Sequence, residues 1–161
     1  MSRILIYTNP DSYKVYGSIS KAVIGIILFD LAGYQFPGKN WDDFIVTIMG
    51  WWLRAIIDLK TGASKKEDLY FMDGPFLVTV EKRNASMCSL YFIERDIAVL
   101  KAVDLYPLDD LADSMLSAAQ QVYSACLEHQ WQDEDKDVKD LKERIDQLSE
   151  LYPDLGTECQ G

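Results

Sequence analysis

The chain has 161 residues, of which 48% are hydrophobic and 26% charged, the composition of a globular protein and not of a disordered one. This length suits a single domain with its own core, since a fold of about 150 residues buries roughly 68–70% of its unfolded surface. The net charge of −10 disfavours binding to nucleic acid or anionic lipid, and the longest apolar run, residues 22–29, is far shorter than the roughly 20 residues that cross a membrane.

Residues 2–8 are apolar and β-prone and predict a first strand, which the turn-forming residues 9–12 are expected to end. Residues 23–31 are almost continuously apolar and rich in isoleucine and valine. This pattern is typical of a strand that is covered on both faces near the middle of a sheet.

A helix is predicted over residues 40–60. Asn40 is expected to cap it, Asp42 and Asp43 to complement the dipole in its first turn, and Gly62 to end it. Apolar side chains recur at helical spacing, and we expect this face to lie in the core. Its members are Phe44, Ile48, Trp51, Trp52, Ala55 and Leu59.

Three or four strands are predicted between residues 68 and 103, in the order of a meander. Pro107 suits the first position of a long helix, and a last helix is expected over residues 134–152. Together these elements predict an α+β fold, with an antiparallel sheet of about five strands, one helix between strands and two C-terminal helices packed on the sheet.

No linker or repeat divides the chain. We therefore expect one domain over residues 1–153 and a flexible C-terminal tail over residues 154–161.

The cysteines and the N-terminal segment indicate a location inside the cell. Cys88, Cys126 and Cys159 are spaced by 38 and 33 residues, which matches neither a disulfide framework nor a zinc site. The apolar run that starts at Ile4 is shorter than that of a secretory signal. We expect reduced thiols and a cytoplasmic location.

Negative charge is concentrated in the last third of the sequence. Residues 1–100 contain 11 acidic and 11 basic side chains, whereas residues 101–161 contain 15 acidic and five basic ones. Such an asymmetry produces a directional field that attracts cationic surfaces. The sequence therefore predicts a basic macromolecular partner.

Catalytic motifs are scarce. His129 is the one histidine, and it follows Cys126 by three residues on the same face of a predicted helix. A thiol enzyme built on this pair stays open as an alternative, but a nucleophilic cysteine needs a lowered pKa and the surroundings are acidic. The acidic run 133–137 begins like a calcium-binding loop, but Val138 and Arg144 occupy its decisive glycine and glutamate positions. We expect no catalytic residue, metal or cofactor.

Two stretches resemble a known family. They are Phe36-Pro37-Gly38 followed by Trp41-Asp42-Asp43-Phe44 and the Gly50-Trp51-Trp52 helix, and Tyr70-Phe71-Met72-Asp73-Gly74-Pro75-Phe76 before a strand. Together they are similar to small immunity proteins of bacterial polymorphic-toxin and contact-dependent growth-inhibition systems. The resemblance covers roughly residues 23–81. It implies a cytoplasmic protein that binds and neutralises one toxin domain, frequently a nuclease, and it transfers no contact residues.

We therefore expect an immunity protein that binds a basic toxin domain through an acidic surface, with charge setting the rate of association. The sequence does not indicate the oligomeric state. A small-ligand or regulatory domain with an aromatic pocket near Trp41 and Trp51 is the alternative. The residues expected to contact the partner are Asp104, Asp109, Asp110, Asp113, Glu128, Trp131, Asp133, Glu134, Asp135, Asp137 and Asp140.

Overall fold

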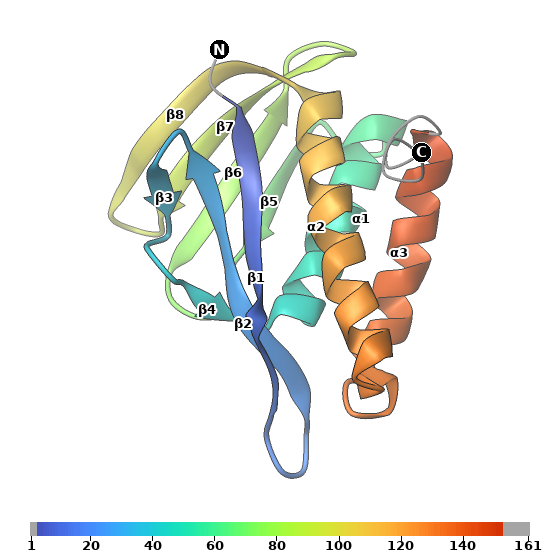
Figure 1. Cartoon of the computed structure of the whole chain (residues 1–161). Helices are drawn as coiled ribbons and strands as arrows, with labels where there is room; N and C mark the ends of the chain where they lie inside the picture. The colour runs from blue at the N-terminus through green and yellow to red at the C-terminus, as the bar shows by residue number, and fades with distance from the viewer. Residues whose placement is uncertain (1–2, 153–161) are drawn as a thin grey trace.

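The computed structural model describes residues 3–152, which form two antiparallel sheets and three α-helices (Figure 1). The first sheet contains β1 (Ile4–Tyr16), β2 (Ala22–Leu31), β3 (Tyr34–Phe36) and β4 (Asp42–Asp43). The second contains β5 (Lys66–Tyr70), β6 (Phe76–Lys82), β7 (Met87–Glu94) and β8 (Ala98–Pro107). The helices are α1 (Ile45–Thr61), α2 (Leu108–Glu128) and α3 (Asp137–Leu151), with a 3₁₀ turn, η1 (Trp131–Asp133), before α3.

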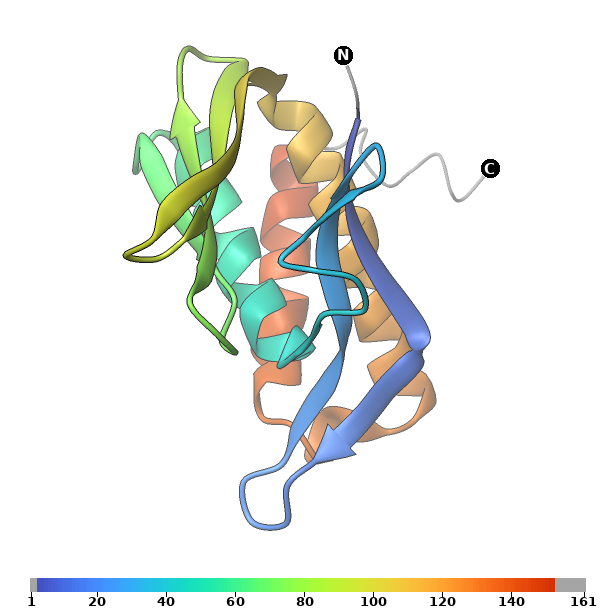
Figure 2. The ribbon, with the colours of Figure 1, turned by 90° about the vertical axis from the view of Figure 1, so that its left-hand side faces the viewer.

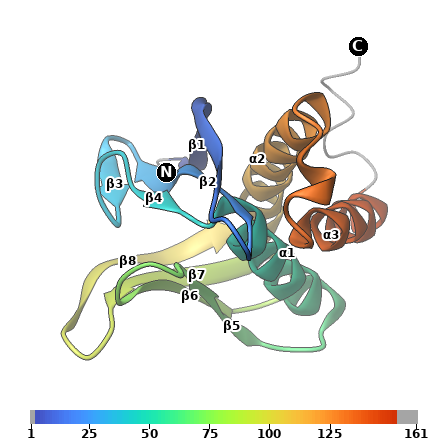
Figure 3. The same ribbon diagram turned by 90° about the horizontal axis from the view of Figure 1, so that it is seen from below.

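The α+β class and the meander order β5-β6-β7-β8 are confirmed, but the prediction of one sheet of about five strands is wrong. β2 pairs with β1 on one side and with both β3 and β4 on the other, so its sheet ends there. The chain then passes through α1 before a second sheet begins at β5. In Figure 3 the two sheets lie on opposite sides of the view, with α2 and α3 together on one flank.

The predicted turn at residues 9–12 is a bulge within β1, which continues to Tyr16. The Asn9 side chain accepts the Asp11 backbone N–H (3.0 Å), and the Ser12 hydroxyl accepts the N–H of Ile26 on β2 (2.8 Å). The pairing register of β1 with β2 shifts across this segment and then resumes. The extended β1–β2 hairpin therefore projects beyond the rest of the sheet (Figure 2).

Helix α1 starts later than predicted. Asn40 does not cap it, because Asp42 and Asp43 first form the short strand β4 and the helix begins at Ile45. Its predicted end is confirmed, since Gly62 follows the last turn with a left-handed φ of 86°.

Trp51 lies outside the core, contrary to the sequence prediction. Its side chain is 47% exposed, whereas Trp52 is fully buried. Because α1 packs against β2, β5, α2 and α3, more than half of its circumference is covered, and the centre of that buried face is turned away from Trp51. Trp51 lies on the remaining exposed strip, next to Arg54.

An aromatic cluster joins the two sheets across α1. The Phe29 ring of β2 lies 5.2 Å from Trp52 of α1 and 5.7 Å from Phe92 of β7, measured between ring centroids. Phe71 packs edge-on against Trp52 at 5.1 Å and against Phe36 of β3 at 6.0 Å. Such contacts add to the burial of apolar area and fix the relative position of the sheets.

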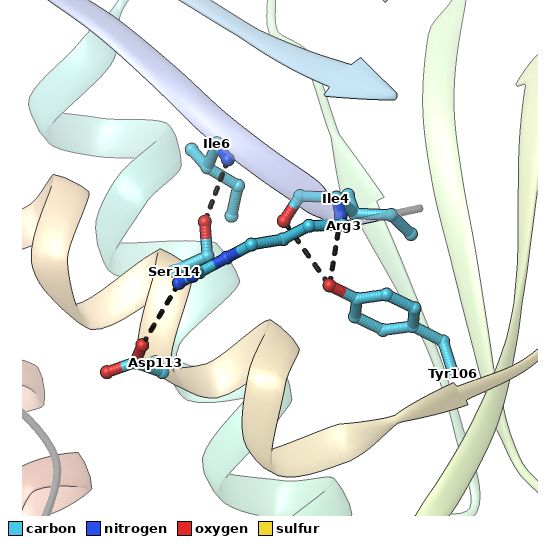
Figure 4. A network of polar contacts seen from close by, with 6 residues as sticks. All are labelled: Arg3, Ile4, Ile6, Tyr106, Asp113 and Ser114. Atoms are coloured by element: carbon cyan, nitrogen blue, oxygen red, sulfur yellow. Dashed lines mark hydrogen bonds and ion pairs between the residues drawn. The ribbon is translucent and has the colours of Figure 1, made fainter. Parts of the chain in front are cut away.

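The free edge of β1 is closed by side chains. The Tyr106 hydroxyl accepts the Ile4 backbone N–H (2.9 Å) and the Ser114 hydroxyl accepts the Ile6 backbone N–H (2.9 Å), as Figure 4 shows. Arg3 forms an ion pair with Asp113 (3.3 Å), which lies beside Ser114 in α2. These contacts satisfy donors that would otherwise be open to another strand.

Candidate partner-binding surface

Most of the acidic side chains predicted to contact a partner lie on the helical hairpin that α2, η1 and α3 form. Residues 108–151, which cover α2, η1 and α3, carry 12 acidic and four basic side chains, a net charge of −8. Residues 1–107 carry 12 of each and have no net charge. We call the exposed or partly exposed acids of this hairpin the acidic helical surface. They are Asp109, Asp110, Asp113, Glu128, Asp133, Glu134, Asp137, Asp140, Glu143, Asp146 and Glu150.

This surface is long. Asp110 lies in the first turn of α2 and Glu128 is its last residue, so at 1.5 Å per residue they are about 27 Å apart. A typical interface covers about 800 Å² of each partner, roughly this width. The field of the whole hairpin can act on an approaching protein, but direct contact at both ends requires a partner that spans it.

Many of these acids already have intramolecular partners. Glu134 forms an ion pair with Lys21 of the β1–β2 hairpin (2.8 Å), and Asp137 accepts a hydrogen bond from the Thr47 hydroxyl of α1 (2.7 Å). Further ion pairs join Asp109 to Lys60, Asp113 to Arg3, Asp140 to Arg144 and Asp146 to Lys142. Within the acidic helical surface, the exposed acids with no such partner are Asp110, Glu128, Asp133, Glu143 and Glu150.

Asp135 is not available to a partner, contrary to the sequence prediction. It is 2% exposed, and its carboxylate accepts the backbone N–H groups of Val23 on β2 (2.9 Å) and of Asp137 (2.9 Å). Burial raises the pKa of Asp135, and the two hydrogen bonds oppose this shift. The residue ties the turn before α3 to the first sheet.

Asp104 lies apart from the other predicted contacts. It is exposed on β8, in the second sheet, where its backbone carbonyl accepts a hydrogen bond from the Ser89 hydroxyl. The structure therefore does not bring it together with the helical acids.

Trp131 opens η1 at the end of the acidic helical surface where α2 meets α3. Its ring stacks on that of His129, with centroids 4.4 Å apart and planes inclined by 20°. The pair lines an open hollow with Val15, Gly17, Lys21 and Glu134, between the loop end of the β1–β2 hairpin and this turn. An aromatic pair beside Glu128 and Asp133 has the composition of an interface hot spot.

Cys126 and His129 lie in different environments. Cys126 is fully buried, and burial raises the pKa of its thiol to about 12, so it is protonated at neutral pH. His129 caps the C-terminus of α2 and is exposed. Cys88 is likewise buried, and its pKa is raised to about 12. In residues 3–152 no group of three or more His, Cys, Asp or Glu side chains could hold a metal ion.

The two tryptophans of the predicted ligand pocket are separate. Trp41 packs edge-on against Phe71 (6.1 Å) and Phe76 (5.3 Å), whereas Trp51 lies on the exposed strip of α1. Trp41 also donates its indole N–H to the carboxylate of Asp43 (3.0 Å).

Asp43 is a further buried acid that sequence reasoning assigned wrongly. We expected it in the first turn of a helix, but its carboxylate accepts the backbone N–H groups of Phe44 (2.7 Å) and Asp73 (3.2 Å) as well as the Trp41 indole. Desolvation raises the pKa of Asp43, and these hydrogen bonds oppose the shift. Its role is to join β4 to the loop before β6, and the Asp-Gly-Pro segment gave no signal of this contact.

No protein-family model, curated protein or solved structure matches the chain. Among residues 3–152 no helix is long and apolar enough to cross a membrane. The functional assignment therefore depends on the surface itself and on the sequence resemblance.

Proposed function

We propose that this chain is an immunity protein that binds a basic toxin domain through its acidic helical surface and thereby neutralises it. The observation that carries the proposal is the distribution of charge. Residues 108–151, which form one helical hairpin, have a net charge of −8, whereas residues 1–107 have no net charge. A surface of this sign favours a cationic protein and repels nucleic acid.

A nuclease is the partner that fits this chemistry best. Enzymes that bind a polyanion have a cationic substrate site, and an inhibitor that presents carboxylates can occupy or cover such a site with complementary charge. Electrostatic steering raises association rates to about 10⁸–10⁹ M⁻¹s⁻¹ at low salt. A fast rate is useful where the toxin must be captured before it cleaves nucleic acid.

The lifetime of the complex needs desolvated contacts as well as charge. Trp131 and its stacking partner His129 are flanked in the sequence by the exposed acids Glu128 and Asp133. Aromatic side chains at the centre of an interface dominate its binding energy, whereas peripheral charges contribute little. We therefore place the centre of the contact at the turn between α2 and α3.

The test uses the product of the gene directly upstream of this chain, which the proposal requires to be a toxin domain with nuclease activity. Titration with the chain should give a one-to-one complex and abolish cleavage of nucleic acid at equimolar ratio. Cells that express the toxin domain should grow only when the chain is co-expressed. A toxin domain that stays active with excess chain, and forms no complex by calorimetry, would exclude the proposal.

A further inference from the structure

β8 is a long strand at the edge of the second sheet, and its outer edge has no neighbour within residues 3–152. Its backbone pairs with β7 alone, and its other contacts include the start of α2, Ile4 of β1 through the Tyr106 hydroxyl, and Tyr34 of β3 through Lys101. Four large aliphatic side chains of β8 and of the residue before it are strongly exposed. Natural proteins rarely leave a long apolar edge strand uncovered. Their exposed fractions are 72% for Ile97, 55% for Val99, 45% for Leu100 and 49% for Leu105.

The other long edge of the fold is protected, which makes β8 distinctive. The edge of β1 is closed by the hydroxyl groups of Tyr106 and Ser114 (Figure 4). The edge strand β5 has only five residues, of which Lys66, Glu67 and Asp68 are charged. Short, charged or covered edges resist pairing with another strand, whereas a long apolar edge promotes it.

We infer that β8 pairs with β8 of a second copy of this chain, which joins two four-stranded sheets into one antiparallel sheet of eight strands around a two-fold axis. The contact is isologous, as in most homodimers, because the same strand contributes both sides.

Charge selects a second copy over a basic partner. Residues 97–107 contain one base, Lys101, and one acid, Asp104, and therefore carry no net charge. A cationic protein is drawn to the acidic helical surface, which begins in the first turn of α2 after the end of β8 and extends away from β8 along α2 and α3 (Figures 1 and 3). Two copies that meet at β8 keep these acidic surfaces apart, and repulsion beyond a Debye length of roughly 8 Å is screened at physiological salt.

The pairing of β8 with β7 limits the possible register. Lys101, Ala102 and Val103 pair regularly with β7, and the register shifts on either side of them. A two-fold axis beside Ala102 places each Ala102 opposite its own copy and each Lys101 opposite Val103 of the second copy. In this register neither Lys101 nor Asp104 faces its own copy, so no like charges lie directly opposite.

The first test measures the mass of the chain in solution, without any toxin, by light scattering and sedimentation over concentrations from about 1 to 300 μM. The mass should rise from 18.4 kDa towards twice that value. The double variant Leu100→Lys/Leu105→Lys should raise the dimer dissociation constant by about tenfold or more, because lysines on an edge strand oppose pairing.

Ile19→Lys/Leu127→Lys is the matched control, since these aliphatic side chains are 97% and 46% exposed, lie in the loop of the β1–β2 hairpin and at the end of α2, and the variant adds the same charge. It should leave the dimer intact. A wild-type chain that is monomeric at every concentration would overturn the inference. A dimer that both double variants weaken equally, or that neither variant weakens, would also overturn it.

The second test fixes the geometry. Directly opposed residues in an antiparallel pair have Cα atoms about 4.5–5.5 Å apart, within reach of a disulfide. Ala102→Cys, in a Cys159→Ser background and with oxidised glutathione as the oxidant, should give a covalent dimer, while Ser117→Cys on the exposed face of α2 should not. Equal cross-linking of the two variants would exclude pairing through β8.

Discussion

The replacement of Asp135 by alanine should destabilise the protein strongly and leave the partner surface unchanged. The substitution removes the acceptor of two backbone hydrogen bonds, from Val23 and from Asp137, each 2.9 Å long. Val23 is fully buried, so its N–H would lose its partner without access to water.

Hydrogen bonds to a charged group contribute about 1.5–3 kcal/mol each, and the desolvation of the carboxylate offsets part of this. We expect the free energy of unfolding to fall by about 2–4 kcal/mol, which for a domain of this size lowers Tm by roughly 5–15 °C. Denaturant titration followed by tryptophan fluorescence measures this loss. Asp133→Ala, at an exposed acid two residues away, is the control and should change stability by less than about 0.5 kcal/mol.

The pH dependence has a defined sign. Because burial raises the pKa of Asp135 in the folded state, the folded protein binds this proton more tightly than the unfolded chain does. The stability of wild type relative to Asp135→Asn should therefore decrease as pH rises from the ordinary aspartate pKa of about 3.9 through the raised value. Equal stability of the alanine variants of Asp135 and Asp133, or a relative stability that increases over this range, would refute the reasoning.

Three further outcomes are expected. In thermal denaturation, Trp52→Ala should lower the free energy of unfolding by about 3–5 kcal/mol and Trp51→Ala by less than about 1 kcal/mol, because Trp52 is buried and Trp51 is exposed. Equal losses would contradict the observed orientation of the helix. Tyr106→Phe should lower the free energy of unfolding by about 1–2 kcal/mol and accelerate hydrogen exchange at the first amides of β1. Unchanged exchange would mean that the hydroxyl does not close this edge. In the native protein, Cys88 and Cys126 should not react with iodoacetamide at about pH 8 until denaturant is added, because burial raises both thiol pKa values to about 12. Labelling of either cysteine in the native protein, detected by peptide mapping, would refute this.

The elements that the sequence predicted correctly are those whose signal is local and repeated. The long helix predicted from Pro107 is α2, and its regularly spaced apolar residues, which include Leu111, Met115 and Val122, are buried. The continuous apolar run of β2 lies between β1 and the β3 and β4 strands of its sheet. In both cases one periodic pattern over many residues agrees with the packing.

The features that the sequence did not reveal depend on contacts between distant residues. Residues 9–12 have the composition of a turn, but pairing on both sides with β2 converts them into a bulge. Asp135 lies in an acidic run typical of a solvated surface, yet it is buried by a contact with Val23, 112 residues earlier in the chain. Trp51 follows helical spacing, but the width of a buried face depends on how many elements surround the helix.

The central claim, that the acidic helical surface attracts a basic partner, is tested most directly by association kinetics. The variant Asp110→Asn/Glu128→Gln/Asp133→Asn neutralises three exposed acids on α2 and the following turn. The matched control, Asp11→Asn/Asp42→Asn/Asp96→Asn, has the same net charge of −7 but loses three exposed acids from the sheets and their turns.

The measurement is stopped-flow association with the toxin domain of the proposed complex at several salt concentrations. The account predicts that the helical variant associates about tenfold more slowly than wild type at low salt and depends weakly on ionic strength, whereas the control keeps a near-wild-type rate and salt slope. Equal rates and salt slopes for the two variants would contradict the account, because the position of the negative charge would then have no effect on binding.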